Sequence, residues 1–507
     1  MRLIRDAFTV RGLTLLSRVA GFVRDALTAA VLGAGAAADA FFVAFKLANL
    51  LRRLFAEGAF AAGFVPLFAR TLEGEGPDEA RRFAEEAAAW MASILLLVVI
   101  AAELAMPWLV RVLATGFDPA GERYALAVDL SRITFPYLAF VSLAALLSGV
   151  LNGLGRFAAA AFAPVLLNLF LIGALLLALA LSLPAAHALA WGVFAAGIGQ
   201  LALLALALHR ARFALRPRLP RRSPRMARLF ALVLPGAVGA GVYQLNLIVD
   251  TWFASHLEEG AVSWLFYADR LQQLPLGAVG VALGTALLPA LSRHLRAGRV
   301  SEARETLNRA LEFGMLLTLP AATALVVAAP PIVRGLFERG AFDAADSAAT
   351  AAALSAFALG LPAYVGIKVL APGYFAREDT RTPVRIAATC LLLNIVLVAL
   401  LVGPLAHVGI ALATALSNWI NVALLARGLL QAGHLAPDRR LVRRLGAVLL
   451  SCLVMAAVLA ALQQGLPLAP LPLLALLVAA GSVSYGAAAL LTGALRAGEL
   501  RALLSRG

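Results

Sequence analysis

The chain consists of long apolar stretches separated by short polar connections. A helix needs about 20 apolar residues to cross the hydrocarbon core of a bilayer, so each stretch of that length predicts a membrane-spanning helix. The predicted spans are 12–32, 38–68, 88–112, 126–151, 160–182, 187–208, 228–256, 262–291, 310–333, 347–374, 384–403, 406–429, 444–463 and 470–494. The pattern therefore predicts an all-α polytopic membrane protein with fourteen transmembrane helices.

The apolar pattern also repeats along the chain. A shift of 223 residues aligns residues 64–70 with 287–293, which share a proline and a final arginine, and it aligns Pro107 with Pro330. The offset drifts little over four spans, which chance similarity of apolar sequence does not explain. We predict two homologous six-helix lobes. Because six is even, the lobes would insert in parallel, related by a pseudo-twofold axis along the membrane normal.

The repeat sets the predicted division of the chain. Residues 1–210 form an N-lobe with spans 1–6, residues 211–227 a basic cytoplasmic linker, and residues 228–430 a C-lobe with spans 7–12. Residues 431–507 contain spans 13 and 14 and a cytoplasmic tail, and they fall outside the duplication. Parallel repeats of this kind are typical of transporters whose two halves move around a central site.

Composition excludes a soluble protein. Hydrophobic residues make up 62% of the chain and charged residues only 14%, far from the balance of a soluble domain. The two cysteines lie in separate apolar spans and the six histidines are scattered, so we expect neither a disulfide nor a metal site.

The formal net charge of +15 raises the question of a nucleic-acid ligand. The arginines, however, lie mostly in the connections after even-numbered spans, while the opposite connections are short or carry few basic residues. That distribution is a topology signal and predicts that both termini are cytoplasmic. We expect no nucleic-acid partner, and we expect the basic linker to contact anionic lipid headgroups.

Charged residues lie inside the first predicted span. Arg24 lies roughly 18 Å into a helix that starts at residue 12, and each such charge costs on the order of 2.5–3.5 kcal/mol on insertion scales. Arg18 and Asp25 are separated by seven residues, close to two turns, so they share one helix face. This face should look into a polar cavity. For any single residue, a structural salt bridge between helices is the alternative interpretation.

The second span carries a polar stripe. Asp39, Lys46 and Arg53 follow one another at intervals of seven residues. Asn49 and Glu57 each lie four residues from Arg53, and Glu57 could pair with it as an ion pair on the same face. The spacing predicts that all five side chains face the same polar cavity.

Basic groups outnumber acidic groups in this predicted cavity. The basic residues are Arg18, Arg24, Lys46, Arg52, Arg53 and Arg270, and the acidic residues are Asp25, Asp39, Glu57 and Asp269. The ligand should therefore be an anion. Arginine presents a planar fork of donors that matches phosphate oxygens two at a time, which favours a diphosphate. The acids would hold the arginines in place when the site is empty.

Three stretches resemble one known family. They are SRVAGFVRDALTAAVLGAGAAADAFFVAFKLANLLRRLFAEGAF (17–60), LNGLGRFAAAAFAPVLLN (151–168) and YFAREDTRTPVRIA (374–387). The first closely resembles the start of the MurJ (MviN) family of lipid II flippases, and the others look like its later signatures. The resemblance covers essentially the whole chain.

The resemblance implies a fourteen-helix fold of the MOP superfamily with two lobes around a central cavity. It implies transport rather than catalysis, with no cofactor. The cargo would be lipid II, the undecaprenyl-diphosphate-linked precursor of peptidoglycan, moved from the inner to the outer leaflet of the bacterial cytoplasmic membrane. Membrane lipids and other cell-wall synthesis proteins are the further partners that it implies, with a role in cell-wall biogenesis and cell shape.

The resemblance also assigns residues. The family's transport positions match Arg18, Arg24, Asp25, Asp39, Arg52 and Arg270, and the supporting positions match Ser17, Asn49, Glu57, Ser263 and Asp269. Spans 13 and 14 would form a groove for the polyprenyl tail. This sequence departs from the family at Ala48, where a proline is usual, which leaves the shape of the second span open.

Sodium, protons or chloride could each couple transport. Some family members bind sodium between spans 7, 11 and 12, and Asp250, Asn394 and Thr414 look like that site. Val398, however, stands where an acidic ligand is expected.

Four alternative functions account for parts of this pattern. A flippase for another lipid-linked oligosaccharide would carry the same charges, whereas a cation-coupled multidrug exporter of the same superfamily would want an acid-rich cavity. A membrane glycosyltransferase or lipid phosphatase would need an acid, base or metal cluster at one face, and the connections 116–123 and 338–347 show none. A structural scaffold explains the spans but not the arginines within them.

Overall fold

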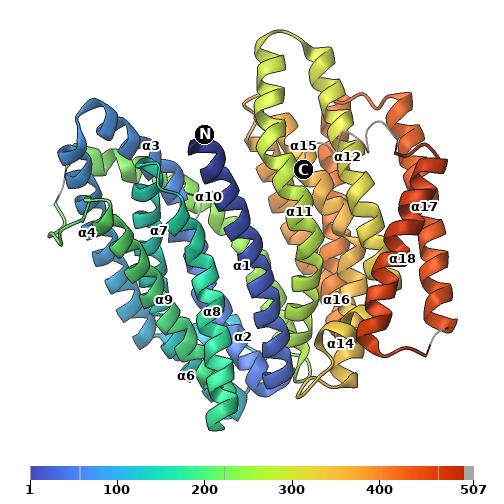
Figure 1. The fold of residues 1–507 in the computed structure, drawn as a ribbon, viewed down its shortest axis with the longest axis horizontal. Helices are drawn as coiled ribbons and strands as arrows, with labels where there is room; N and C mark the ends of the chain where they lie inside the picture. The colour runs from blue at the N-terminus through green and yellow to red at the C-terminus, as the bar shows by residue number, and fades with distance from the viewer. Residues whose placement is uncertain (1, 56–58, 222, 466, 496–507) are drawn as a thin grey trace. The chain divides into compact units, whose positions relative to one another are not determined.

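The computed structural model describes residues 2–55, 59–221, 223–465 and 467–495; within these ranges the side chains of 2–7, 51, 53–55, 59, 62, 234–247, 278–286 and 465 are not described. The first helices are α1 (Arg2–Leu32), α2 (Ala36–Phe55), α3 (Ala59–Gly74), α4 (Pro77–Leu104), α5 (Met106–Leu113), α6 (Glu122–Thr134), α7 (Tyr137–Gly153), α8 (Ala158–Leu181), α9 (Ala185–Arg210) and α10 (Pro224–Ser255). They are followed by α11 (Ala261–Arg296), α12 (Val300–Val327), α13 (Ala329–Phe337), α14 (Ala344–Leu359), α15 (Leu361–Phe375), α16 (Arg381–Gln431), α17 (Arg439–Gly465) and α18 (Pro470–Leu491) (Figure 1).

The all-α prediction is confirmed. In the described ranges, the only strand-like feature is an isolated bridge between Arg339 and Phe342. Nine helical stretches among the described residues are long and apolar enough to cross a membrane. The chain is therefore a multi-pass membrane protein, and the full count of fourteen spans stays a prediction.

Several predicted spans correspond to two consecutive helices, and the breaks follow the sequence repeat. α4 and α5 meet at Ala105, just before Pro107, and α12 and α13 meet at Ala328, just before Pro330. Both bounds of α12 lie 223 residues after the corresponding bounds of α4, the offset found in the sequence. Proline suits the first turn of a helix, where no amide donor is needed, so it marks the start of the second helix in each pair.

α16 spans two predicted segments, 384–403 and 406–429, which are separated by a local break. Ala406 has non-helical dihedral angles of φ 47° and ψ −130° inside the helix. At this break the backbone closes tightly, because a Cβ on Gly409 would lie 2.3 Å from the carbonyl oxygen of Leu401. Glycine is therefore required at this position for steric reasons.

Replacing Gly409 with alanine is expected to destabilise the break in α16. The added methyl group cannot be accommodated against a backbone oxygen without a backbone shift, which costs about 1–3 kcal/mol. Thermal denaturation of the detergent-solubilised protein measures the effect. Gly403→Ala is the matched control, since a Cβ there meets no atom within 4 Å. Equal melting temperatures for the two variants would contradict the steric account.

The contacts within the chain divide it into two compact units. Unit 1 contains residues 1–263 and 339–342, and unit 2 contains residues 264–338 and 343–507. α10 thus belongs to unit 1, although the repeat assigns it to the C-lobe beginning at residue 228; the repeat-based division stays a prediction. In unit 1, α1 packs against α8, and α2 packs against α6, α7 and α10. These helices position the polar residues described below.

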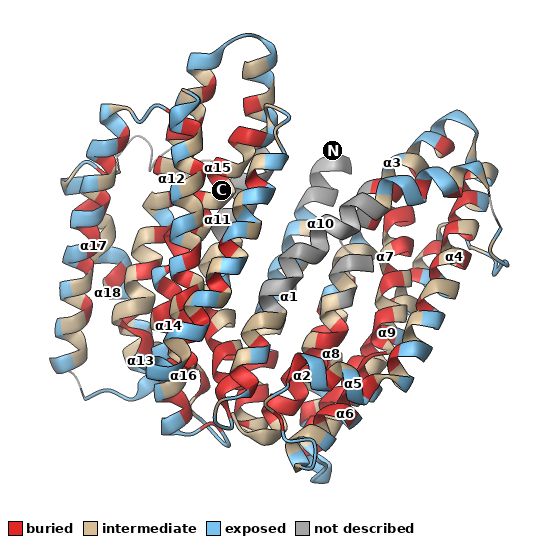
Figure 2. Ribbon diagram, turned by 180° about the vertical axis from the view of Figure 1, so that it is seen from behind, coloured by how far each residue is buried: buried red, intermediate tan, exposed pale blue. Residues whose placement is uncertain are grey.

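In unit 2, α17 and α18 pack against α12 and α13. Glu312 of α12 is buried and accepts hydrogen bonds from Arg440, at 3.3 Å, and from Arg444, both of α17. Only 28% of the residues in an 18-residue apolar stretch of α17, and 22% in such a stretch of α18, are buried within the protein. Figure 2 shows exposed and half-buried residues along both helices. These two helices therefore present much of their apolar surface outward, as expected for contact with lipid.

Candidate functional site

Arg24 of α1 is buried and forms a polar cluster with α8. Its guanidinium donates from Nε and Nη2 to Asp25 Oδ1, at 3.0 and 2.5 Å, and from Nη1 to Asn168 Oδ1, at 3.0 Å. Asn168 in turn donates from Nδ2 to the backbone oxygen of Ser17, at 2.9 Å. Asn168 also packs against α1 at Gly21, where a Cβ would be in ordinary van der Waals contact with its Nδ2, at 3.5 Å. The predicted residues Ser17, Arg24 and Asp25 are therefore brought together.

This arrangement neutralises the charge of Arg24 but engages only some of its hydrogen-bond donors. A guanidinium carries five N–H donors, and three of them are engaged by described residues. The amide of Asn168 carries no charge, so among the described residues Asp25 alone balances the cation. The two remaining N–H donors are the groups that an anionic ligand would bind.

Asp39 of α2 is fully buried and holds the beginning of α11. Its Oδ1 accepts from the backbone nitrogen and the hydroxyl of Ser263, at 2.9 and 2.6 Å, and its Oδ2 accepts from the backbone nitrogen of Gly260, at 2.9 Å. Arg123 donates to Oδ2 at 3.4 Å. Gly260 has φ +98°, a conformation that favours glycine. The carboxylate thus satisfies amide donors at the first turn of a helix, where a negative charge is most stable.

Arg123 completes this second cluster. It donates to the backbone oxygen of Ser255, at 3.2 Å, and its guanidinium lies 4.0 Å from the ring centroid of Phe117. Both oxygens of Asp39 are consequently engaged. The geometry gives Asp39 and Ser263 a positioning role at the α10–α11 connection, and a direct contact of Asp39 with substrate stays a prediction.

The polar stripe on α2 also faces α10. Lys46 Nζ donates to Thr251 Oγ1 of α10 at 2.7 Å. Asn49 donates to the backbone oxygen of Phe45, one turn earlier on its own helix. Asp39 and Lys46 thus both contact the stretch from α10 to the start of α11, and the shared polar cavity stays a prediction. The side chains of Arg53 and Glu57 lie outside the described residues.

Three other basic residues predicted for the site are less buried than Arg24. Arg18 is exposed on α1, and Arg52 is half-buried with its Nε shielded from solvent. In unit 2, the guanidinium of Arg270 lies 4.8 Å from the ring centroid of Phe266, and the neighbouring Asp269 accepts a hydrogen bond from Gln273 at 2.5 Å. A cation above an aromatic face is stabilised by the negative face of the ring.

Two of the residues matched to a sodium site have unsatisfied oxygens. Asn394 Oδ1 and Thr414 Oγ1 of α16 are buried and have no hydrogen-bond partner among the described residues. Val398 is also buried, and its side chain offers no oxygen ligand. Asp250, the third residue matched to that site, belongs to unit 1, whereas Asn394 and Thr414 belong to unit 2. A sodium site at these residues stays a prediction.

Sequence reasoning assigned no role in the site to Asn168 or Arg123. Asn168 carries a detectable signal, since it is an amide inside an otherwise apolar span, where polar groups need a partner. Arg123 gave no such signal, because it lies between two predicted spans, at the start of α6 in the structure, and its partner Asp39 is 84 residues away. Only the folded chain shows that the two residues form a pair.

The comparisons with known proteins agree with one another. A family profile described as "Lipid II flippase MurJ" matches residues 28–476. The "Probable lipid II flippase MurJ" of Rhizobium tropici is 47% identical over 466 residues, covering 91% of this chain and 87% of that protein. The "Lipid II flippase MurJ" of Burkholderia cenocepacia is 39% identical over 461 residues, covering 89% of each.

Solved structures extend the comparison to the fold. "Lipid II flippase MurJ, inward closed conformation" matches with a TM-score of 0.79 at 25% identity, covering 95% of this chain and 97% of that one. An inward-facing multidrug resistance transporter of the MATE family, in the MOP superfamily, matches with a TM-score of 0.71 at 14% identity, covering 84% and 98%. The second likeness concerns the fold alone.

Proposed function

This chain belongs to the lipid II flippase MurJ family, and on that premise we propose that it carries lipid II from the inner to the outer leaflet of the cytoplasmic membrane. It is a transporter rather than an enzyme, as its relatives are. Lipid II carries a diphosphate between its polyprenyl tail and its sugars, so the transporter needs a basic site that is reachable from the membrane. The proposal invokes no cofactor.

The observation that carries the proposal is the state of Arg24. A permanently charged guanidinium is buried in α1 with Asp25 as its one acidic partner among the described residues, and two of its N–H donors are not engaged by those residues. A buried ion pair is a weak source of stability, because well-packed apolar residues in its place often stabilise the fold as well or better. A diphosphate that accepts two hydrogen bonds from one arginine explains why this charge is present.

The finer architecture follows from the repeat. We propose fourteen spans arranged as two parallel six-helix lobes, with α17 and α18 added as a groove for the polyprenyl tail. The equal offset between α4 and α12 supports the duplication. The distribution of arginines supports cytoplasmic positions for both termini. Rocking of the two lobes would then expose one site to each side in turn.

In this mechanism the diphosphate binds the two remaining donors of Arg24 and shares the charge of its guanidinium with Asp25. Arg18, Arg52 and Arg270 provide further donors, while the tail stays in lipid. A membrane potential that is negative inside favours outward movement of the anionic headgroup by about 2.3 kcal/mol per charge per 100 mV. Once the ligand leaves, Asp25 again neutralises Arg24, which lowers the cost of returning with an empty site.

Complementation tests this function. Expression of the chain in bacteria depleted of their own lipid II flippase is expected to restore growth and cell shape. The empty vector is the control. Failure to restore growth, with the protein present in the membrane at normal levels, would contradict the proposal.

The multidrug-exporter alternative is tested in the same cells. We expect no energy-dependent efflux of a fluorescent lipophilic cation above the vector control, because the described buried clusters carry as many basic groups as acids. Efflux without growth rescue would favour the exporter.

A further inference from the structure

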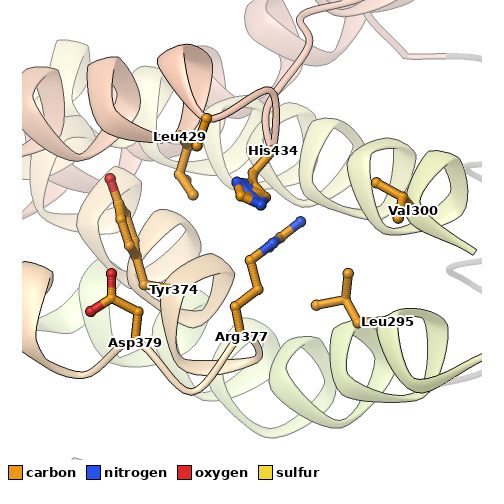
Figure 3. Close-up of a pocket in the computed structure, with 8 residues that line it drawn as sticks. Leu295, Val300, Tyr374, Arg377, Asp379, Leu429 and His434 are labelled. Carbon is orange, nitrogen blue, oxygen red and sulfur yellow. The ribbon is translucent and has the colours of Figure 1, made fainter. Parts of the chain in front are cut away.

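Unit 2 contains a cavity that none of the predicted transport residues lines. It has a volume of about 380 Å³, within the range of small-molecule sites. Its walls come from the ends of α11, α12, α15 and α16 and from the connections beside them. The lining residues are Leu295, Val300, Tyr374, Arg377, Asp379, Leu429, Ala432 and His434 (Figure 3). The cavity thus joins a largely apolar wall to a few polar groups.

Arg377, which lines this cavity, and Arg304, which lies beside the Gly433–His434 connection, have unused buried donors. Arg377 donates from Nη1 to the backbone oxygen of Gly373, at 2.6 Å, but its Nη2 is buried and has no hydrogen-bond partner among the described residues. Arg304 Nε is buried and likewise without a partner in that part of the chain. Leaving such a donor unsatisfied costs about 1–3 kcal/mol, and more when the group is charged, so each calls for a missing acceptor.

The two arginines converge on the connection that follows α16. Arg304 Nη2 lies 3.5 Å from the position that a Cβ on Gly433 would occupy, next to His434. Figure 3 shows the guanidinium of Arg377 pointing toward the imidazole of His434. Burial, and then the charges of Arg377 and Arg304, lower the pKa of His434 below its ordinary value. Burial and the charge of Arg304 likewise lower the pKa of Arg377. The positive potential is therefore concentrated at one spot.

The acid of this cavity is engaged elsewhere. Asp379 Oδ1 accepts a hydrogen bond from the backbone nitrogen of Thr382, at 3.0 Å, in the first turn of α16. This bond makes the largest of several contributions that hold the pKa of Asp379 below its ordinary value. Figure 3 shows its carboxylate on the side of Tyr374, away from the guanidinium of Arg377. Asp379 consequently serves the helix terminus and leaves the two arginines for an external anion.

We propose that this cavity is a binding site for a phosphate group, held by Arg377 and Arg304 with His434 as a further hydrogen-bond donor. Arginine forks suit phosphate oxygens, and the apolar wall formed by Leu295, Val300 and Leu429 suits an uncharged part attached to the phosphate. The phosphate can come from an anionic phospholipid headgroup or from a soluble phosphate compound. Occupation would tie the α15–α16 connection to the end of α16 and so stabilise unit 2.

Thermal stability of the purified full chain tests the proposal. In a zwitterionic detergent, potassium phosphate is expected to raise the melting temperature above that in potassium chloride of equal ionic strength. In bilayer discs, phosphatidylglycerol is expected to raise it above that in phosphatidylcholine. A response to phosphate without a response to phosphatidylglycerol identifies a soluble source, and a response to phosphatidylglycerol alone identifies a lipid headgroup. A response to both shows that the site accepts phosphate from either source.

Variants assign the response to the cavity. Arg377→Gln and Arg304→Gln, which lie on different elements, should each weaken binding by at least about tenfold, since each removes a charge-assisted hydrogen bond. Arg299→Gln is the matched control: its side chain is 52% exposed and already pairs with Glu302 at 3.1 Å, so it should keep the full response. No response to either probe, or an equal response in all three variants, would overturn the proposal. Should one variant fail to fold, the other decides the result.

Discussion

Replacing Arg24 with alanine is expected to abolish transport. The change removes the guanidinium whose two remaining donors we assign to the diphosphate, and losing two charge-assisted bonds should lower the rate by about two orders of magnitude or more. Arg24→Lys keeps the charge but loses the planar fork, so it should restore little activity. Growth of the flippase-depleted strain, read together with the amount of protein in the membrane, measures both variants.

A control is needed because Arg24 also balances a buried acid. Alanine at position 24 leaves Asp25 without its partner, which can cost about 3–5 kcal/mol of stability. The double variant Arg24→Ala/Asp25→Asn removes that unpaired charge and should return the protein to normal membrane levels. It should still fail to support growth. Growth supported by the double variant would show that Arg24 is structural only.

Replacing Asp39 with asparagine is expected to destabilise unit 1 strongly. The amide keeps one acceptor oxygen, but its NH₂ group would face either the Gly260 or the Ser263 backbone donor, and Arg123 would lose its carboxylate. Breaking such a buried cluster typically costs about 3–5 kcal/mol. The apparent melting temperature in detergent should fall by several degrees.

Ser263→Ala is the graded control for this prediction. It removes one hydroxyl donor to Asp39 and leaves the charge and both backbone bonds in place, so it should cost only about 1 kcal/mol. A melting temperature for Asp39→Asn equal to that of Ser263→Ala, or to that of the unmodified protein, would contradict the role assigned to Asp39.

The helices could be predicted from the sequence because their cause is local. Apolar stretches of membrane length favour helices, and the breaks before Pro107 and Pro330 recur at one offset because each has a proline at the start of its second helix. The break at Ala406 was also anticipated as a boundary between two spans. In each case the determining residues lie within a few positions of the feature that they set.

The site could be predicted only in part. Helical periodicity placed Asp39 and Lys46 on one face, and the cost of buried charge marked Arg24. Periodicity could not name the partners, because these come from remote helices: Asn168 lies 144 residues from Arg24. The positioning role of Asp39 was missed for the same reason, since it depends on the backbone of a connection more than 200 residues away.

We expect Arg24, the buried arginine of α1, to bind the diphosphate of lipid II during its passage across the membrane. The most direct measurement is the amount of lipid II in the outer leaflet of flippase-depleted cells, read as cleavage by a lipid II pyrophosphatase added from outside. If Arg24 binds the diphosphate, we expect cleavage in cells that express the unmodified chain. We expect none above background in cells that express Arg24→Ala/Asp25→Asn at equal levels. Equal cleavage in the two would contradict it.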